Sequence, residues 1–94
     1  MKLIIAIIQD EYVNKVIRTL MDDKIRTTRL SSTGGFLKSG NTTLLIGAQE
    51  EEIDHIVDLI SQQTKSKRVK EGRDEILVGG ANLFVIDIHD HIKL

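Results

Sequence analysis

The stretch Leu3-Ile4-Ile5-Ala6-Ile7-Ile8 decides the fold of this chain. Its apolar residues follow one another without polar alternation, a pattern typical of a strand that is buried on both faces. The run is shorter than the core of a signal peptide, has no small-residue cleavage site and falls far short of the roughly 20 apolar residues of a membrane span. We therefore expect a buried strand here, in a cytoplasmic protein without membrane insertion.

Apolar residues at helical spacing predict two amphipathic helices. The first stripe follows Asp10, a typical N-cap residue, and consists of Val13, Val16, Ile17, Leu20 and Met21. Glu50, Glu51 and Glu52 precede the second stripe, in the first turn of its helix, where the helix dipole favours negative charge. That second stripe consists of Ile53, Ile56, Val57 and Ile60.

Four more segments are expected to be strands. Residues 25–31 are rich in threonine and charge and predict an outer strand, whereas residues 42–48 predict a buried one. Residues 75–78 predict a short strand before Gly79-Gly80. Residues 83–88 predict the last strand, with Phe84 and Ile86 on one face and Leu83 and Val85 on the other. The main elements follow the order β-α-β-β-α-β, which predicts an α+β, ferredoxin-like sandwich with both helices on one face of an antiparallel sheet.

The composition limits the classes of function. The 94 residues, 40% of them apolar, fit a single domain spanning residues 1–94 with one thin core. Cysteine is absent, so disulfides and thiolate chemistry are excluded, and stability must come from packing or oligomerisation. The formal net charge of −1 creates no overall field toward nucleic acid or an anionic membrane.

The first strand poses a problem of coverage, because two helices cover only one face of the sheet. One of its two alternating sets of side chains must face something else: either Leu3, Ile5 and Ile7, or Ile4, Ala6 and Ile8. At roughly 25 cal/mol per Å² of apolar area, leaving such a set in water would forfeit several kcal/mol. We therefore predict a homo-oligomer whose sheets pack on one another.

The loop between two of the expected strands carries the best candidates for chemistry. It reads Thr33-Gly34-Gly35-Phe36-Leu37-Lys38-Ser39-Gly40-Asn41-Thr42, which is far longer than a hairpin needs. Adjacent glycines such as Gly35 let the backbone approach a ligand and present N–H groups to an anion. Phe36 is suited to stacking on a base, and Asn41 can pair with an adenine edge.

The strand before this loop adds two polar candidates. Arg26 and Thr28 alternate onto one face, where they can meet a phosphate and a ribose or base. Together with the loop they predict a nucleotide pocket. Other interpretations stay open, because a Gly-Gly pair before Phe is more often a turn with a buried anchor, and a lone arginine is often a solvated edge charge. The phosphate-loop and dinucleotide-binding glycine patterns are absent, which excludes a standard NTPase.

At these residues the sequence resembles the PII-like cyclic-di-AMP receptors, bacterial relatives of the nitrogen-regulatory PII signalling proteins. The resemblance covers nearly the whole chain and rests on residues 1–10, on Thr33 to Leu37 with Gly40 to Thr43, and on Val78-Gly79-Gly80-Ala81. It implies a homotrimer of ferredoxin-like subunits that binds cyclic di-AMP in clefts between neighbours, without a cofactor and without catalysis. The ligand contacts that it implies are Arg26, Thr28, Gly35, Phe36, Leu37, Asn41 and Gly47.

The chain departs from the family pattern in two places. Only residues 63–74 separate the second helix from the next strand, where members of the family have a much longer loop. Lys24 stands where an asparagine is expected, and it replaces a group that donates and accepts with a pure donor. We expect these departures to bear on how the site closes or how a partner is gripped.

Two charged segments outside the loop have competing interpretations. The basic stretch of Lys65, Lys67, Arg68, Lys70 and Arg73 either receives the phosphates of ATP, ADP or the cyclic dinucleotide, or forms an exposed loop balanced by acidic neighbours. His89 and His91 beside Asp90 can hold a divalent metal, but such a pair near a chain end is more typical of a polar tail, so we predict no metal site.

No nucleophile, base and orienting acid are arranged for catalysis in the sequence, so we predict no catalytic residues. The leading function is a non-enzymatic signalling module, in which a nucleotide orders residues 32–41 and changes the surface shown to an unidentified downstream protein. The alternative is a PII-like or cation-tolerance-like trimer that binds ATP, ADP, another small ligand or a metal. A degradative enzyme on the same fold ranks third.

Overall fold

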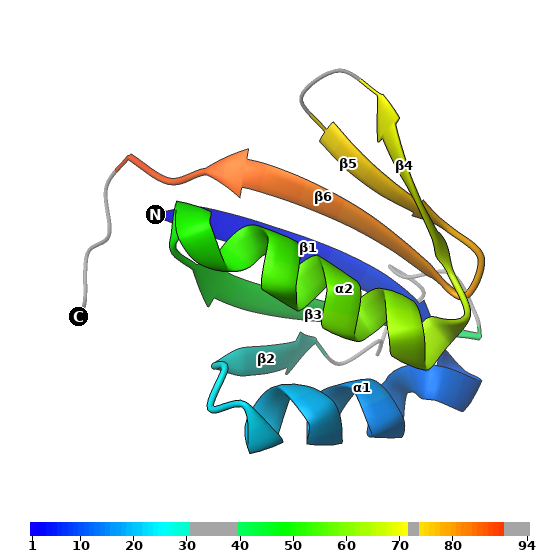
Figure 1. Ribbon diagram of the computed structural model, residues 1–94. Helices are drawn as coiled ribbons and strands as arrows, with labels where there is room; N and C mark the ends of the chain where they lie inside the picture. Colours follow the sequence, from blue (N-terminus) through cyan, green and yellow to red (C-terminus); the bar gives the residue numbers. More distant parts are fainter. Residues whose placement is uncertain (31–39, 72–73, 90–94) are drawn as a thin grey trace.

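The computed structural model describes residues 1–30, 40–71 and 74–89, and for residues 67–71 and 74–78 it describes the backbone alone. Its elements are β1 (Lys2–Gln9), α1 (Asp10–Asp22), β2 (Thr27–Leu30), β3 (Asn41–Ala48), the 3₁₀ turn η1 (Glu50–Glu52), α2 (Ile53–Thr64), β4 (Lys67–Glu71), β5 (Asp74–Val78) and β6 (Ala81–Asp87). The two helices lie side by side against the sheet (Figure 1).

Four of these strands form an antiparallel sheet in the order β2-β3-β1-β6. The apolar strand β1 lies inside this sheet, where it pairs with β3 from Lys2↔Ala48 to Gln9↔Asn41 and with β6 from Lys2↔Asp87 to Ile8↔Ala81. Its continuous run of isoleucines suits this position, because both edges of the strand are paired and both faces are available for packing. The predicted α+β, ferredoxin-like arrangement is confirmed.

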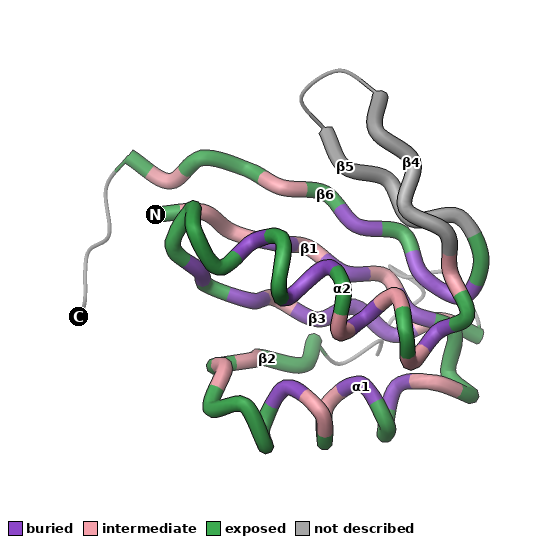
Figure 2. Tube along the Cα trace, viewed as in Figure 1, coloured by how far each residue is buried: buried purple, intermediate pink, exposed green. Residues whose placement is uncertain are grey.

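The hydrophobic core lies between the sheet and the helices (Figure 2). Ile4, Ala6 and Ile8 of β1 are fully buried in it, together with the inward faces of both helices. These faces carry most of the residues of the two predicted stripes. Met21 is the exception, because it lies at the last turn of α1 and is 66% exposed.

The other side of the sheet, which we call the open face, is apolar and uncovered by the helices. It carries Leu3, Ile5 and Ile7, which are half-buried. Beside them in the register lie Phe84 and Ile86 of β6, which are 45% and 46% exposed. The two faces of β6 were therefore assigned correctly, and the open set of β1 is Leu3, Ile5 and Ile7.

The start of α1 differs from the prediction. The helix begins at Asp10 itself and Gln9 takes the N-cap position, so the assignment of Asp10 as N-cap was wrong. The physical reason is that β1 runs directly into the helix, with Gln9 still paired to Asn41. The Asp10 carboxylate instead accepts a hydrogen bond from the hydroxyl of Thr42 at 2.7 Å, and its backbone N–H donates to the carbonyl of Gly40 at 2.9 Å. Asp10 thus joins α1 to the start of β3.

Replacing Asp10 with alanine is expected to lower the free energy of unfolding by about 1–3 kcal/mol, because the hydroxyl of Thr42, a residue that is 7% exposed, loses its acceptor. Urea unfolding of the two proteins measures this difference. Glu11→Ala is the matched control, since Glu11 is also an acidic residue in the first turn of α1 but is not the acceptor for Thr42. Equal losses in the two variants would show that only the helix dipole is affected.

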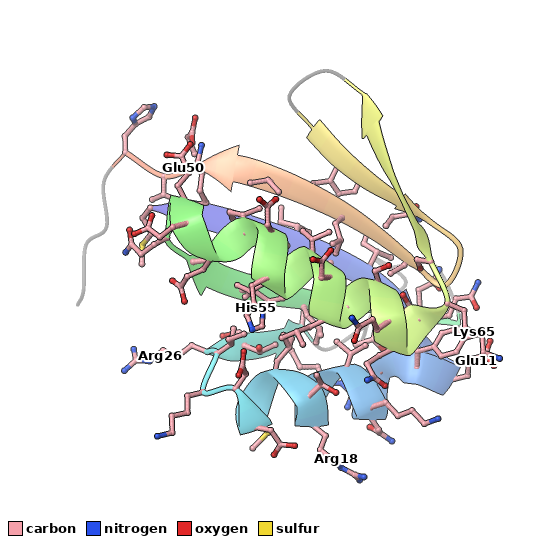
Figure 3. The ribbon with its side chains drawn as sticks, in the orientation of Figure 1. Glu11, Arg18, Arg26, Glu50, His55 and Lys65 are labelled. Atoms are coloured by element: carbon pink, nitrogen blue, oxygen red, sulfur yellow. The ribbon has the colours of Figure 1, made fainter. Side chains whose placement is uncertain are left out.

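The three glutamates before α2 also take a different form from the one predicted. They form η1, directly before the helix, and the Glu52 side chain accepts a hydrogen bond from the backbone N–H of Gln49 at 2.9 Å. On the same side of the molecule, His55 of α2 contacts the Asp23 carboxylate just after α1 (Figure 3). The helices are therefore joined by polar contacts as well as by the core.

A separate two-stranded hairpin follows α2. β4 and β5 pair in antiparallel register from Lys67↔Val78 to Glu71↔Asp74, and the hairpin projects away from the four-stranded sheet (Figure 1). The predicted strand at residues 75–78 is confirmed as β5. The strand β4 was not predicted, because four of its five residues are charged and this basic stretch was expected either to receive phosphates or to form an exposed loop.

The base of this hairpin is closely packed around Gly79 and Gly80. Gly79 has a φ of +140°, which favours glycine. The backbone of Gly80 donates to the carbonyl of Thr64 at 3.2 Å and accepts from the N–H of Gln9 at 2.9 Å. A Cβ on Gly80 would lie 2.5 Å from that carbonyl oxygen and 2.5 Å from the ring of Tyr12. The Gly79-Gly80 pair therefore has a structural role, in which it joins the hairpin to α2 and β1.

Candidate functional site

The candidate site is a hollow of about 350 Å³ on the open face, at the end of the sheet where β2 begins. This volume is at the lower end of the range for small-molecule sites. The residues that line it come from four stretches of the chain: Met1, Leu3, Arg26, Thr28, Leu45, Gly47 and Ile88. Three of the residues predicted for the site, Arg26, Thr28 and Gly47, are among them.

Arg26 and Thr28 form the polar side of the hollow. Thr28 pairs with Leu45 of β3, and Arg26 lies two residues earlier, so both point to the open face. Figure 3 shows Arg26 at the start of β2. Both side chains are exposed, and within the described part of the chain no hydrogen bond or ion pair engages the guanidinium of Arg26. Its planar set of donors is suited to a phosphate, and the Thr28 hydroxyl can donate and accept.

Gly47 and its neighbours form an apolar floor. Gly47 pairs with Leu3 of β1, and Leu45 lies two residues before it on the same face of β3. A Cβ at Gly47 would be 3.9 Å from the side chain of Met1. Because Gly47 has no side chain, the surface is recessed there between apolar neighbours. This shape suits the flat face of a base or sugar.

Sequence reasoning did not name four of the residues that line the hollow. Leu3 and Leu45 could have been found, because period-two alternation along their predicted strands places them beside Gly47 and Thr28. Met1 and Ile88 gave no such signal, since they lie at far ends of the sequence. A hydrogen bond from the Ile88 N–H to the Met1 carbonyl, 3.0 Å long, brings them together.

The remaining predicted contacts do not lie in this hollow. Asn41 is the first residue of β3 and pairs with Gln9, at the opposite end of the strand from Gly47. Six residues of extended strand separate the two, which corresponds to about 20 Å. Gly35, Phe36 and Leu37 lie outside the described residues. One chain therefore brings together Arg26, Thr28 and Gly47 but not Asn41.

Lys24, the first departure from the family pattern, is not among the residues that line the hollow. Lys24 is exposed in the turn between α1 and β2 and has a left-handed backbone with φ of 58°, a conformation that asparagine adopts more readily than lysine. The basic stretch begins at Lys65, which lies at the opposite end of the molecule from Arg26 (Figure 3). Within one chain, the cation at Lys65 and the one at Arg26 do not meet.

Neither a metal-binding cluster nor a membrane-spanning helix is present among the described residues. No group of three or more His, Cys, Asp or Glu side chains within them is placed to hold a metal ion; His89 is exposed, and His91 lies outside the described part. None of the helices in that part of the chain is both long and apolar enough to cross a membrane.

The hollow on an open sheet face, lined by an arginine, a hydroxyl and an apolar floor, is a candidate site for a small ligand on a ferredoxin-like fold. A model of the cyclic-di-AMP receptor family matches residues 1–73 of the chain. The chain belongs to this family, whose members are non-enzymatic signalling proteins. The match ends between β4 and β5, in the segment where the sequence departs from the family pattern.

A solved structure supports the fold over the full length. It is described as a functionally unknown protein from Pediococcus pentosaceus ATCC 25745, and it is 35% identical in sequence, with a TM-score of 0.74. The alignment covers 99% of this chain and 96% of that one. The similarity therefore extends through β4, β5 and β6, beyond the part matched by the family model.

Proposed function

We propose that this chain binds cyclic di-AMP in the hollow on the open face, with Arg26, Thr28 and Gly47 as contacts. The observation that carries the proposal is their convergence on one hollow from β2, β3 and the segment before β2. Arg26 meets a phosphate, Thr28 meets a ribose or base, and a base lies over the floor at Gly47. Family membership supports cyclic di-AMP as the ligand.

The site is completed by a second copy of the chain. Asn41 lies at the far end of β3 from Gly47 and does not line the hollow. In the proposed assembly a neighbouring copy supplies Asn41 together with Gly35, Phe36 and Leu37. The ligand then bridges two subunits.

The proposed assembly is a homotrimer in which the open faces pack together. Phe84 and Ile86 are each nearly half exposed in the single chain, and burying them would contribute about 1 kcal/mol each. Thr43, on the same face, is 4% exposed, and its buried hydroxyl has no hydrogen-bond partner among the described residues. Buried hydroxyls are normally hydrogen-bonded, so a neighbouring group on this face would satisfy it.

The ligand signal is proposed to pass through residues 32–41. A ligand that contacts Phe36 of one copy and Arg26 of its neighbour changes the surface that both present to a downstream protein. Gly40, where this segment enters β3, is bonded to the backbone of Asp10. A conformational change in this segment would therefore be transmitted to the start of α1.

Calorimetric titration with cyclic di-AMP, cyclic di-GMP, ATP and ADP tests the proposed ligand. We expect heat of binding with cyclic di-AMP at low micromolar concentrations, and weaker or no heat with the other three nucleotides. Among the four, only cyclic di-AMP carries two adenines on one cyclic sugar-phosphate backbone. Binding of ATP or ADP alone would support the adenine-nucleotide alternative. No heat with any of the four at high micromolar concentration would remove the proposal.

Replacing Gly47 with leucine tests the location of the site. The new side chain is expected to fill the floor of the hollow and weaken cyclic-di-AMP binding by about tenfold or more. Gly47→Ala is the graded control, because its methyl group would make only an ordinary contact with Met1 at 3.9 Å. Thermal unfolding of both variants checks that the fold is retained. Unchanged affinity in a folded Gly47→Leu protein would place the ligand elsewhere.

A further inference from the structure

The two far ends of the described chain meet beside the candidate site. Met1 and Ile88 both line the hollow, and the N–H of Ile88 donates to the carbonyl of Met1 at 3.0 Å. Ile88 lies just beyond β6, so it is outside the regular ladder that pairs β6 with β1. The position of Ile88 at the hollow therefore depends on the contacts made where β6 ends.

An ion pair lies at the last residue of β6, directly before Ile88. The ammonium of Lys2 bonds the carboxylate of Asp87, and these two residues form the last pair of the β1–β6 register. The hydrogen bond and the charge of Lys2 lower the pKa of the Asp87 carboxyl. Each partner lies one residue from a residue that lines the hollow, Lys2 beside Met1 and Asp87 beside Ile88.

We infer that the segment 88–89, directly after β6, is a wall of the ligand site through Ile88, and that Lys2 and Asp87 act as positioning residues that keep Ile88 against Met1. The inference rests on the proposed function for the identity of the ligand, but not for the geometry of the wall. Ligand binding and docking of this segment are then thermodynamically linked, because a ligand that contacts Ile88 binds only the docked arrangement. Affinity falls by the fraction of time that the segment is undocked.

The test in the ligand-free protein uses Asp87→Asn, which removes the charge with little change of shape. Amide hydrogen exchange at Ile88, followed by NMR, is expected to become about two- to fivefold faster, the size of effect that an exposed ion pair supports. The double variant Lys2→Asp with Asp87→Lys is expected to restore the slow exchange. Asp22→Asn, which removes an exposed carboxylate at the end of α1, is the control and is expected to leave it unchanged.

The wall itself is tested by Ile88→Ala, which keeps the backbone bond to Met1 but trims the side chain. In the ligand-free protein the amide signal of Gly47 is expected to shift. Titration with cyclic di-AMP is expected to give about fivefold to tenfold weaker binding for Ile88→Ala, and about two- to fivefold weaker binding for Asp87→Asn.

The outcomes separate this inference from the proposed function. Unchanged exchange at Ile88 in Asp87→Asn, or an unshifted Gly47 signal in Ile88→Ala, would overturn the wall whatever the titration shows. Wild-type affinity in both variants, with normal binding by the parent protein, would overturn the linkage to ligand. If the parent protein binds no cyclic di-AMP, the proposed ligand is wrong, and the exchange and chemical-shift results still decide whether the wall exists.

Discussion

Replacing Arg26 with alanine is expected to weaken cyclic-di-AMP binding by about 10- to 100-fold. Loss of a hydrogen bond to a charged group costs about 1.5–3 kcal/mol, and each 1.4 kcal/mol is a factor of ten in affinity. The full effect is expected because Arg26 is one of the residues that line the hollow. Stability should hardly change, since the side chain is exposed and its removal leaves no buried charge unpaired.

Two further variants make this measurement specific. Arg26→Lys keeps the charge but loses the planar fork of donors, so it is expected to recover only part of the affinity. Arg18→Ala removes the same charge from the exposed side of α1, away from the hollow (Figure 3), and is expected to bind normally. Calorimetry on the three proteins at one salt concentration compares them. Equal losses in Arg18→Ala and Arg26→Ala would mean that only the overall charge matters.

Replacing Gly80 with alanine is expected to lower the free energy of unfolding by about 3 kcal/mol, the upper part of the range for overpacking. The added Cβ would lie 2.5 Å from the carbonyl oxygen of Thr64, which is backbone and cannot rotate away. The same shift would break the bond from the Gly80 N–H to that carbonyl. For a domain of this size the change corresponds to a loss of about 10–20 °C in Tm.

Gly47→Ala is the matched control for this stability measurement. Its Cβ would make an ordinary contact at 3.9 Å, and Gly47 does not have a positive φ, so the change in Tm should be small. The proteins must be compared at one chain concentration, because any self-association raises the apparent stability. A Gly80→Ala protein as stable as the parent would contradict the described packing of Thr64, Tyr12 and the turn.

The fold could be predicted largely from hydrophobic pattern. The run from Leu3 to Ile8 and the two helical stripes determine what must be buried, and the sheet order follows from the order of elements. Which face of β1 meets the helices could not be predicted, because both of its faces are apolar. The same limit applies to Asp10: its residue type suits an N-cap, but its bond to Thr42 depends on a pairing between β1 and β3 that residue type does not reveal.

The candidate site was predicted in part. Arg26 and Thr28 were found because alternation along a strand and side-chain chemistry both pointed to a ligand, whereas Gly47 came from the family resemblance alone. Met1 and Ile88 were missed because their contact joins residues at far ends of the chain. The hairpin strand β4 was missed for another reason: four of its five residues are charged, and such a run is as typical of a solvated loop as of an exposed strand.

The separation of Asn41 from Gly47 along β3 has a consequence for how such a protein would behave in a cell. In the proposed assembly, a ligand that contacts both residues needs two chains, so half-saturation would depend on the amount of protein as well as on the amount of nucleotide. Below the concentration at which the chains associate, the same nucleotide level would go undetected. The copy number of the protein would then set the threshold of the response, and control of its synthesis would be a way of tuning sensitivity without altering a single contact.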